Sequence, residues 1–73
     1  MSLDEQKNTA AKKACLYVAD QLEAKKIALA ESPELLKYFA DNIDGAKSED
    51  DLKKLTEGVE KMNPDLPKFD PGV

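Results

Sequence analysis

AKKACLYVADQLEAKKIAL, residues 11–29, is the stretch whose apolar pattern decides the fold. An α-helix turns by about 100° per residue, so side chains three and four positions apart share one face. The apolar side chains on that face are Ala11, Ala14, Cys15, Val18, Leu22 and Leu29. The pattern predicts one long helix whose apolar stripe packs against the rest of the chain, with Cys15 among the buried side chains.

This first helix is predicted either to run from about Ser2 to Ala30 or to break near Lys25 and Lys26, where a lysine occupies a core-facing position. Ser2 is followed three positions later by Glu5, which is the spacing of a capping box, and neither Gly nor Pro occurs before Pro33. Leu16 and Ile27 fall on the side of the helix opposite the stripe. Either they are isolated apolar side chains on a surface, or the C-terminal segment or a second copy of the chain covers them.

Two shorter helices are predicted after Pro33. In the first, over residues 33–43, Ser32 is a cap, Pro33 suits the first turn, and Gly45 ends the helix in a left-handed conformation. Its apolar face consists of Leu35, Leu36, Phe39 and Ile43. The second, over residues 49–62, is capped by Ser48 and buries Leu52, Leu55, Val59 and Met62. The two are expected to pack as an antiparallel pair along the first helix.

The last ten residues are predicted to be extended, because Pro64, Pro67 and Pro71 disfavour helix. Leu66, Phe69 and Val73 recur at intervals of three and four, which indicates docking on the bundle or on a partner. A disordered tail is the alternative. The predicted fold is therefore all-α: a three-helix bundle over residues 1–63 with an extended Pro-rich C-terminal tail over residues 64–73.

Size and cysteine content indicate how such a small domain is stabilised and where it works. A chain of 73 residues with one cysteine and no histidine has no route to a disulfide framework, so self-association as a homodimer is expected. A single cysteine is compatible with a reducing, cytoplasmic location. No apolar run approaches the ~20 residues of a membrane helix, so no membrane interaction is expected.

Charge argues against nucleic acid as a partner. All eleven basic residues are lysine, so the chain lacks the planar guanidinium that reads guanine and clamps phosphate. Residues 32–73 carry the whole net charge of −4 and would repel a polyanion. An acidic mimic of nucleic acid that occupies a DNA-binding protein is a looser interpretation of the same charge.

No pattern of catalytic or metal-ligating residues is complete. Residues 40–51 have some spacing of a calcium loop, but Ala40 stands where the first carboxylate is required. Cys15 has no histidine to activate it. The sequence therefore predicts neither an enzyme nor a cofactor.

The expected function is a non-enzymatic protein–protein interaction or regulatory module. The candidate interaction residues are the apolar side chains left over from the predicted core: Leu16, Ile27, Leu66, Phe69 and Val73. The alternative is a small-ligand-binding regulatory protein with a pocket between the helices near Tyr17, Tyr38 and Phe39. A filled core with exposed apolar patches favours the first function, and an internal cavity favours the second.

Overall fold

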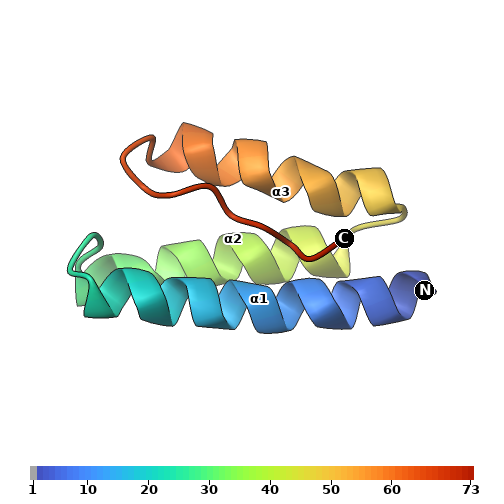
Figure 1. Cartoon of the computed structure of the whole chain (residues 1–73), viewed down its shortest axis with the longest axis horizontal. Coiled ribbons are helices and arrows are strands. Elements are labelled where there is room, and N and C mark those ends of the chain that lie inside the picture. The colour runs from blue at the N-terminus through green and yellow to red at the C-terminus, as the bar shows by residue number, and fades with distance from the viewer. Residues whose placement is uncertain (1) are drawn as a thin grey trace.

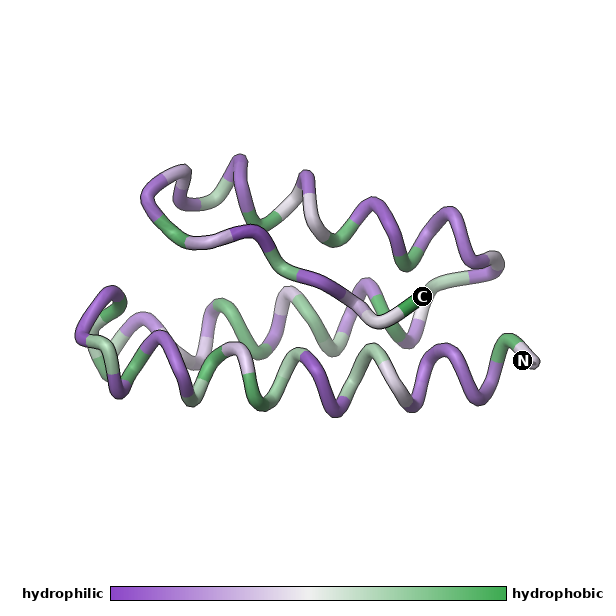
Figure 2. Tube along the Cα trace, in the orientation of Figure 1, coloured by the Kyte–Doolittle hydropathy of each residue, from purple (hydrophilic) through white to green (hydrophobic). Residues whose placement is uncertain are grey.

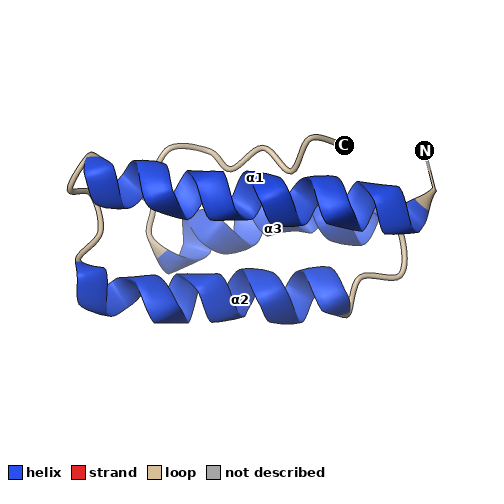
Figure 3. Ribbon diagram, turned by 90° about the horizontal axis from the view of Figure 1, so that it is seen from below, coloured by secondary structure: helices blue, strands red, loops and turns tan. Residues whose placement is uncertain are grey.

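The computed structural model describes residues 2–73, which fold into three antiparallel α-helices (Figure 1). The helices are α1 (Leu3–Glu23), α2 (Ser32–Asp44) and α3 (Glu49–Met62), and a short 3-10 turn, η1 (Leu29–Glu31), precedes α2. Figure 3 shows α1 and α2 side by side with α3 behind them. The part of the chain that the structure describes contains no strand, which confirms the predicted all-α, three-helix architecture.

Serine side chains begin α1 and α3, as predicted. The Ser2 hydroxyl oxygen accepts a hydrogen bond from the backbone N–H of Glu5 at 3.2 Å. The Ser48 hydroxyl oxygen accepts one from the N–H of Asp51 at 3.4 Å. A cap of this kind stabilises a helix by about 1 kcal/mol, because it satisfies a backbone donor that has no partner within the helix.

The first helix ends at Glu23, next to the break near Lys25 and Lys26 that was the alternative to a continuous helix as far as Ala30. Lys25 adopts a left-handed conformation with φ of 60°, and its N–H donates to the carbonyl of Leu22. The N–H of Lys26 donates to the carbonyl of Gln21 at 2.9 Å, which completes a Schellman motif. The chain then turns so that Ile27 is buried, whereas Leu29 is 78% exposed. The predicted positions of Ile27 on the outer side of the helix and of Leu29 in the buried stripe are therefore wrong.

The ends of α2 differ in detail from the prediction. Ser32 is the first residue of the helix, and its hydroxyl donates to the carbonyl of Leu29 at 2.7 Å instead of accepting from the helix. Gly45 follows the last residue, as predicted, but in a right-handed conformation with φ of −81°. The reason is that the chain continues in the same sense to Ala46, whose N–H donates to the carbonyl of Ile43 and whose side chain is buried.

The core is one cluster of side chains contributed by all three helices, by Ile27 and Ala46 in the loops between them, and by Phe69. In Figure 2 the hydrophobic positions of α3 face the other helices and its hydrophilic positions face outward. The fully or nearly buried apolar residues are Ala10, Ala14, Tyr17, Val18, Ile27, Leu35, Phe39, Ile43, Ala46, Leu52, Leu55, Val59 and Phe69. The predicted packing of Val18 against the apolar faces of the two later helices is thus confirmed, although Leu22 is only partly buried.

Residues 64–73 run back along the bundle between α1 and α3 (Figure 1). The carbonyl of Phe69 accepts a hydrogen bond from the Thr56 hydroxyl of α3 at 2.6 Å. The carbonyl of Pro67 accepts one from the Tyr17 hydroxyl of α1, also at 2.6 Å. Both hydroxyl groups hold the backbone of this segment, and the Phe69 ring between them is 2% exposed. The segment therefore joins α1 to α3.

Candidate functional site: a groove between α1 and α2

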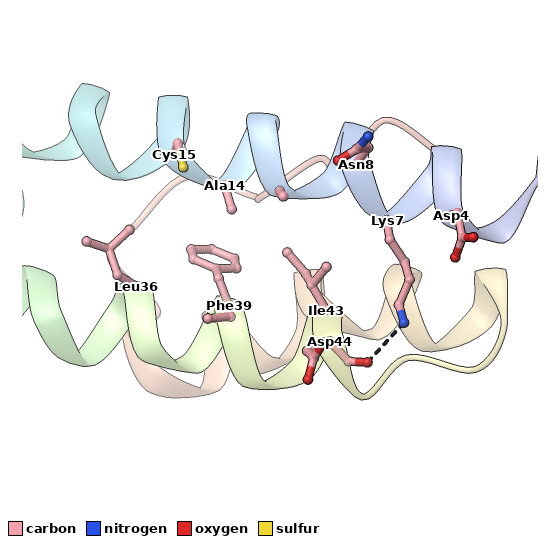
Figure 4. Close-up of a pocket in the computed structure, with 11 residues that line it drawn as sticks. Asp4, Lys7, Asn8, Ala14, Cys15, Leu36, Phe39, Ile43 and Asp44 are labelled. Atoms are coloured by element: carbon pink, nitrogen blue, oxygen red, sulfur yellow. Dashed lines mark hydrogen bonds between the residues drawn. The ribbon is translucent and has the colours of Figure 1, made fainter.

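An open groove of about 660 Å³ lies between α1 and α2, and Figure 4 shows the side chains that line it. The buried side chains of Ala14, Phe39 and Ile43 form its floor. Its walls are short or apolar: Ala11 and Cys15 on α1, Leu36 and Ala40 on α2. Leu36 is 41% exposed, so the groove has an apolar side chain at its edge that no part of the described chain covers.

The groove exists because the apolar stripe of α1 is wider than the surface that α2 and α3 cover. The buried side of α1 runs through Ala14, Tyr17, Val18 and Gln21. Cys15 follows Ala14 by one residue and is therefore turned by about 100° from it, which leaves the thiol exposed. The prediction that Cys15 is buried is wrong for this reason. The uncovered edge of the stripe consists of Ala11, Cys15 and Leu22.

One end of the groove is polar. The Lys7 ammonium group donates a hydrogen bond to the backbone carbonyl of Asp44 at 2.9 Å, visible in Figure 4. This contact neutralises part of the partial negative charge at the C-terminus of α2. The carboxylates of Asp4 and Asp44 also line this end. The groove thus has an apolar centre and a charged end, which is the general pattern of a protein interface.

A second depression lies beyond the other end of the same side of α1. It is lined by Leu22, Lys25, Lys26 and Leu29 together with the backbone turn between α1 and α2. Leu22 is seven residues after Cys15, so it lies on the same side of α1, two turns further along. The apolar groove and this lysine-flanked depression therefore lie on the same side of α1, and we name the two together the α1/α2 face.

The five interaction residues predicted from sequence do not form one site: Leu16 and Phe69 line one depression, and Ile27 and Leu66 line another. Ile27 and Phe69 are buried in the core, and Leu66 and Val73 are partly buried against it. Leu16 is 63% exposed, on the side of α1 that faces the C-terminal segment, beside Lys68 and Asp70. The α1/α2 face was missed because Cys15 and Leu22 were assigned to the core, although both belonged to the stripe that the sequence identified.

The aromatic residues proposed as a ligand pocket pack mainly against one another. The ring centres of Tyr17 and Phe39 are 6.0 Å apart, and the Phe69 ring lies 5.3 Å from Tyr17 and 4.7 Å from Phe39. Burial raises the pKa of the Tyr17 and Tyr38 hydroxyls above the usual 10.0. Of the three residues predicted to line the pocket, only Phe39 lines the groove.

The loop between α2 and α3 uses its polar groups to begin α3. A carboxylate oxygen of Asp51 accepts a hydrogen bond from the N–H of Lys47 at 2.9 Å, and Ser48 caps the helix. Within residues 2–73, no three Asp, Glu or Cys side chains come together as metal ligands. Nor does any helix of this part of the chain have both the length and the apolar character needed to cross a bilayer.

Comparison with known proteins identifies no relative. No protein-family model matches the chain, and no curated protein or solved structure matches it significantly. The function must therefore be inferred from the geometry and chemistry of the α1/α2 face.

Proposed function

We propose that this chain is a non-enzymatic interaction module that binds another protein on its α1/α2 face. The observation that carries the proposal is the groove itself, an apolar surface bounded by charged side chains and left uncovered by the bundle. Contiguous apolar patches of this kind on small proteins are commonly docking sites, since binding removes them from water.

The groove walls suit a helical partner. Ala11, Cys15 and Ala40 are short, so a docked helix can approach the backbones of α1 and α2 closely. Leu36 stands at the edge and can insert between side chains of the partner. Each Å² of apolar surface covered contributes about 25 cal/mol, so covering the groove favours binding.

The composition of the site supports binding rather than catalysis. The one amine in the groove, on Lys7, is hydrogen-bonded to the carbonyl of Asp44, and the sequence has no histidine to act as a general base beside Cys15. We further propose a cytoplasmic location, because an exposed free thiol is compatible with a reducing compartment. The excess of acidic residues argues for a protein partner rather than a nucleic acid.

Site-specific photocrosslinking tests the proposal. A photoreactive amino acid is placed at position 36 in the groove, and a matched variant carries it at position 16, also an exposed leucine but on the other side of α1. Both are expressed in cells of the source organism and irradiated. We expect a discrete covalent adduct from position 36 and none from position 16. Equal labelling from both positions, or none from position 36, would contradict the proposal.

A small apolar ligand is the second candidate occupant, favoured by the groove volume of about 660 Å³. This volume is within the range of roughly 300–1,000 Å³ typical of ligand pockets. Titration of a library of small apolar compounds, followed by the NMR signals of the Ala11 and Ala40 methyl groups, tests this function. Saturable shifts confined to the groove would support it, and uniform or absent shifts would exclude it.

A further inference from the structure

We infer that the partner of the α1/α2 face is a second copy of this chain, bound face to face about a two-fold axis that crosses the helices. This inference rests on the proposed function and specifies its partner. In such a dimer the α1 helices of the two copies stack antiparallel, and so do the α2 helices. The interface then consists of two layers of two helices each.

The area of the face matches what a stable dimer requires. The Cα trace measures 34 × 19 × 17 Å, and α1 and α2 together form a side of 34 × 17 Å. That side is nearly one fifth of the surface of a box with these edges, which scales to an upper bound of about 900 Å² of the 4888 Å² accessible area when the entire side is covered. A specific interface takes about 800 Å² from each partner. A second α1/α2 face has this area, whereas a single docked helix leaves part of it uncovered.

Charge selects the antiparallel arrangement over the parallel one. Asp4 and Asp44 lie at one end of the face, where Lys7 is already bound to the α2 terminus. Lys25 and Lys26 lie at the other end, where the Glu31 carboxylate is bound to the N–H of Ala28. With the axis across the helices, the end of each copy that has a net negative charge meets the end of the other that has a net positive charge, twice per dimer. With the axis along the helices, like charges would meet at both ends.

Side-chain size also fits this register. The Lys7 contact with Asp44 fixes how α1 and α2 lie side by side, and a rise of about 1.5 Å per residue then sets Ala11 opposite Ala40 and Cys15 opposite Leu36. The centre of the face lies between these two levels. A two-fold axis there brings Leu36 of one copy onto Ala40 of the other, so that a large side chain fills the space beside a small one. The same axis brings the two Cys15 residues near each other.

Sedimentation equilibrium of the purified full chain is the primary test. We expect wild-type protein to be dimeric at about 100 µM, and Leu36→Asp to raise the dissociation constant at least about tenfold. Leu16→Asp is the matched control, since it adds the same charge to another exposed leucine on α1, and should change the constant by less than about twofold. Circular dichroism checks that both variants keep their helices, as expected for exposed positions.

Cross-linking and charge reversal test the orientation. A short bismaleimide should join two wild-type chains through Cys15, while Cys15→Ser/Leu16→Cys, with its thiol one residue along and off the face, should yield little dimer. Asp4→Lys and Lys26→Glu should each weaken the dimer, and the double variant should regain affinity because the pairs are restored with reversed sign. The antiparallel arrangement would be overturned if the double variant lost as much dimerisation free energy as the two single variants lose together.

The outcomes separate this inference from the proposed function. A monomer at about 1 mM would overturn self-association. In that case, a discrete adduct from position 36 with a mass other than twice that of the chain would still support an interaction module with a different partner. A dimer that Leu16→Asp disrupts and Leu36→Asp does not would overturn the assignment to the α1/α2 face.

Discussion

The hydroxyl of Tyr17 in α1 donates a hydrogen bond to the carbonyl oxygen of Pro67, 50 residues later, with 2.6 Å between the two oxygens. The same tyrosine ring packs edge-on against Phe39 of α2 and Phe69 of the C-terminal segment. One side chain therefore anchors that segment through both a polar and an apolar contact. Three aromatic residues from three parts of the sequence meet at this point, and their contacts close the bundle between α1 and α3.

Tyr17→Phe removes the hydrogen bond to Pro67 and keeps the ring. We expect the free energy of unfolding to fall by about 1 kcal/mol, the net value of a hydrogen bond of this kind. Tyr38→Phe is the matched control, because the Tyr38 hydroxyl makes no hydrogen bond within residues 2–73, and should change stability by less than about 0.5 kcal/mol. Urea denaturation followed by circular dichroism measures both. Equal losses in the two variants would show that the Pro67 contact adds nothing.

Alkaline pH should loosen the same contact. Burial raises the pKa of the Tyr17 hydroxyl above 10.0, so folding favours its protonated form. The resulting stability is fully present below the unfolded-state pKa of about 10 and is lost as pH rises through the higher folded-state pKa. We therefore expect the stability difference between wild type and Tyr17→Phe to shrink above about pH 10, because only wild type loses this contribution. Other titrating groups are common to both proteins, so parallel stability curves up to about pH 12 would contradict the assignment.

Lys25→Gly should stabilise the protein. Lys25 holds a left-handed conformation, which costs about 1–2 kcal/mol for a residue with a Cβ atom, while glycine costs about 0.5–1 kcal/mol in chain entropy. The expected net gain is about 0.5–1 kcal/mol in the free energy of unfolding. Lys26→Gly removes the same charge from the next residue, where φ is not positive, and should not stabilise. If both variants were equally stable, relief of backbone strain at Lys25 could not be the cause.

Gly58→Ala should destabilise the protein although alanine favours helix. A Cβ atom at this position of α3 would lie 1.5 Å from the hydroxyl oxygen of Tyr38 in α2, so the tyrosine ring would have to move. We expect a loss of about 1 kcal/mol or more in wild type from this overpacking. In a Tyr38→Ala background the space is free, and the same substitution should gain up to about 1 kcal/mol from helix propensity. A double-mutant cycle by urea denaturation measures the change of sign, and its absence would refute the steric explanation.

Sequence reasoning predicted the elements whose signals are local. Ser2 and Ser48 were identified as caps, and both accept the expected backbone hydrogen bond. The apolar face of α3 is buried through Leu52, Leu55 and Val59, as its spacing indicated, whereas Met62, also predicted to be buried, is 47% exposed. Such patterns depend on a few adjacent residues and on helix geometry. They therefore do not depend on how the helices pack against one another.

What sequence could not give depends on packing between distant segments. The end of α1 near Lys25 remained only one of two alternatives, because a lysine, rather than the usual glycine, takes the left-handed position at residue 25. The centre of its buried face was misplaced because Gln21, a polar residue, is 5% exposed and its side-chain amide oxygen Oε1 accepts no hydrogen bond within residues 2–73. That shift in turn concealed the α1/α2 face, since Cys15 was counted as part of the core.

The buried position of Phe69 between α1 and α3 also predicts the order in which parts of the chain fold. Contacts between consecutive helices close short loops, whereas the pairing of Tyr17 with Pro67 must close one of 50 residues and carries a larger entropic cost. The C-terminal segment should therefore dock after the rate-limiting step. Substitutions that weaken its docking would then accelerate unfolding and leave the refolding rate nearly unchanged, so this segment determines how long a folded molecule lasts more than how quickly it forms.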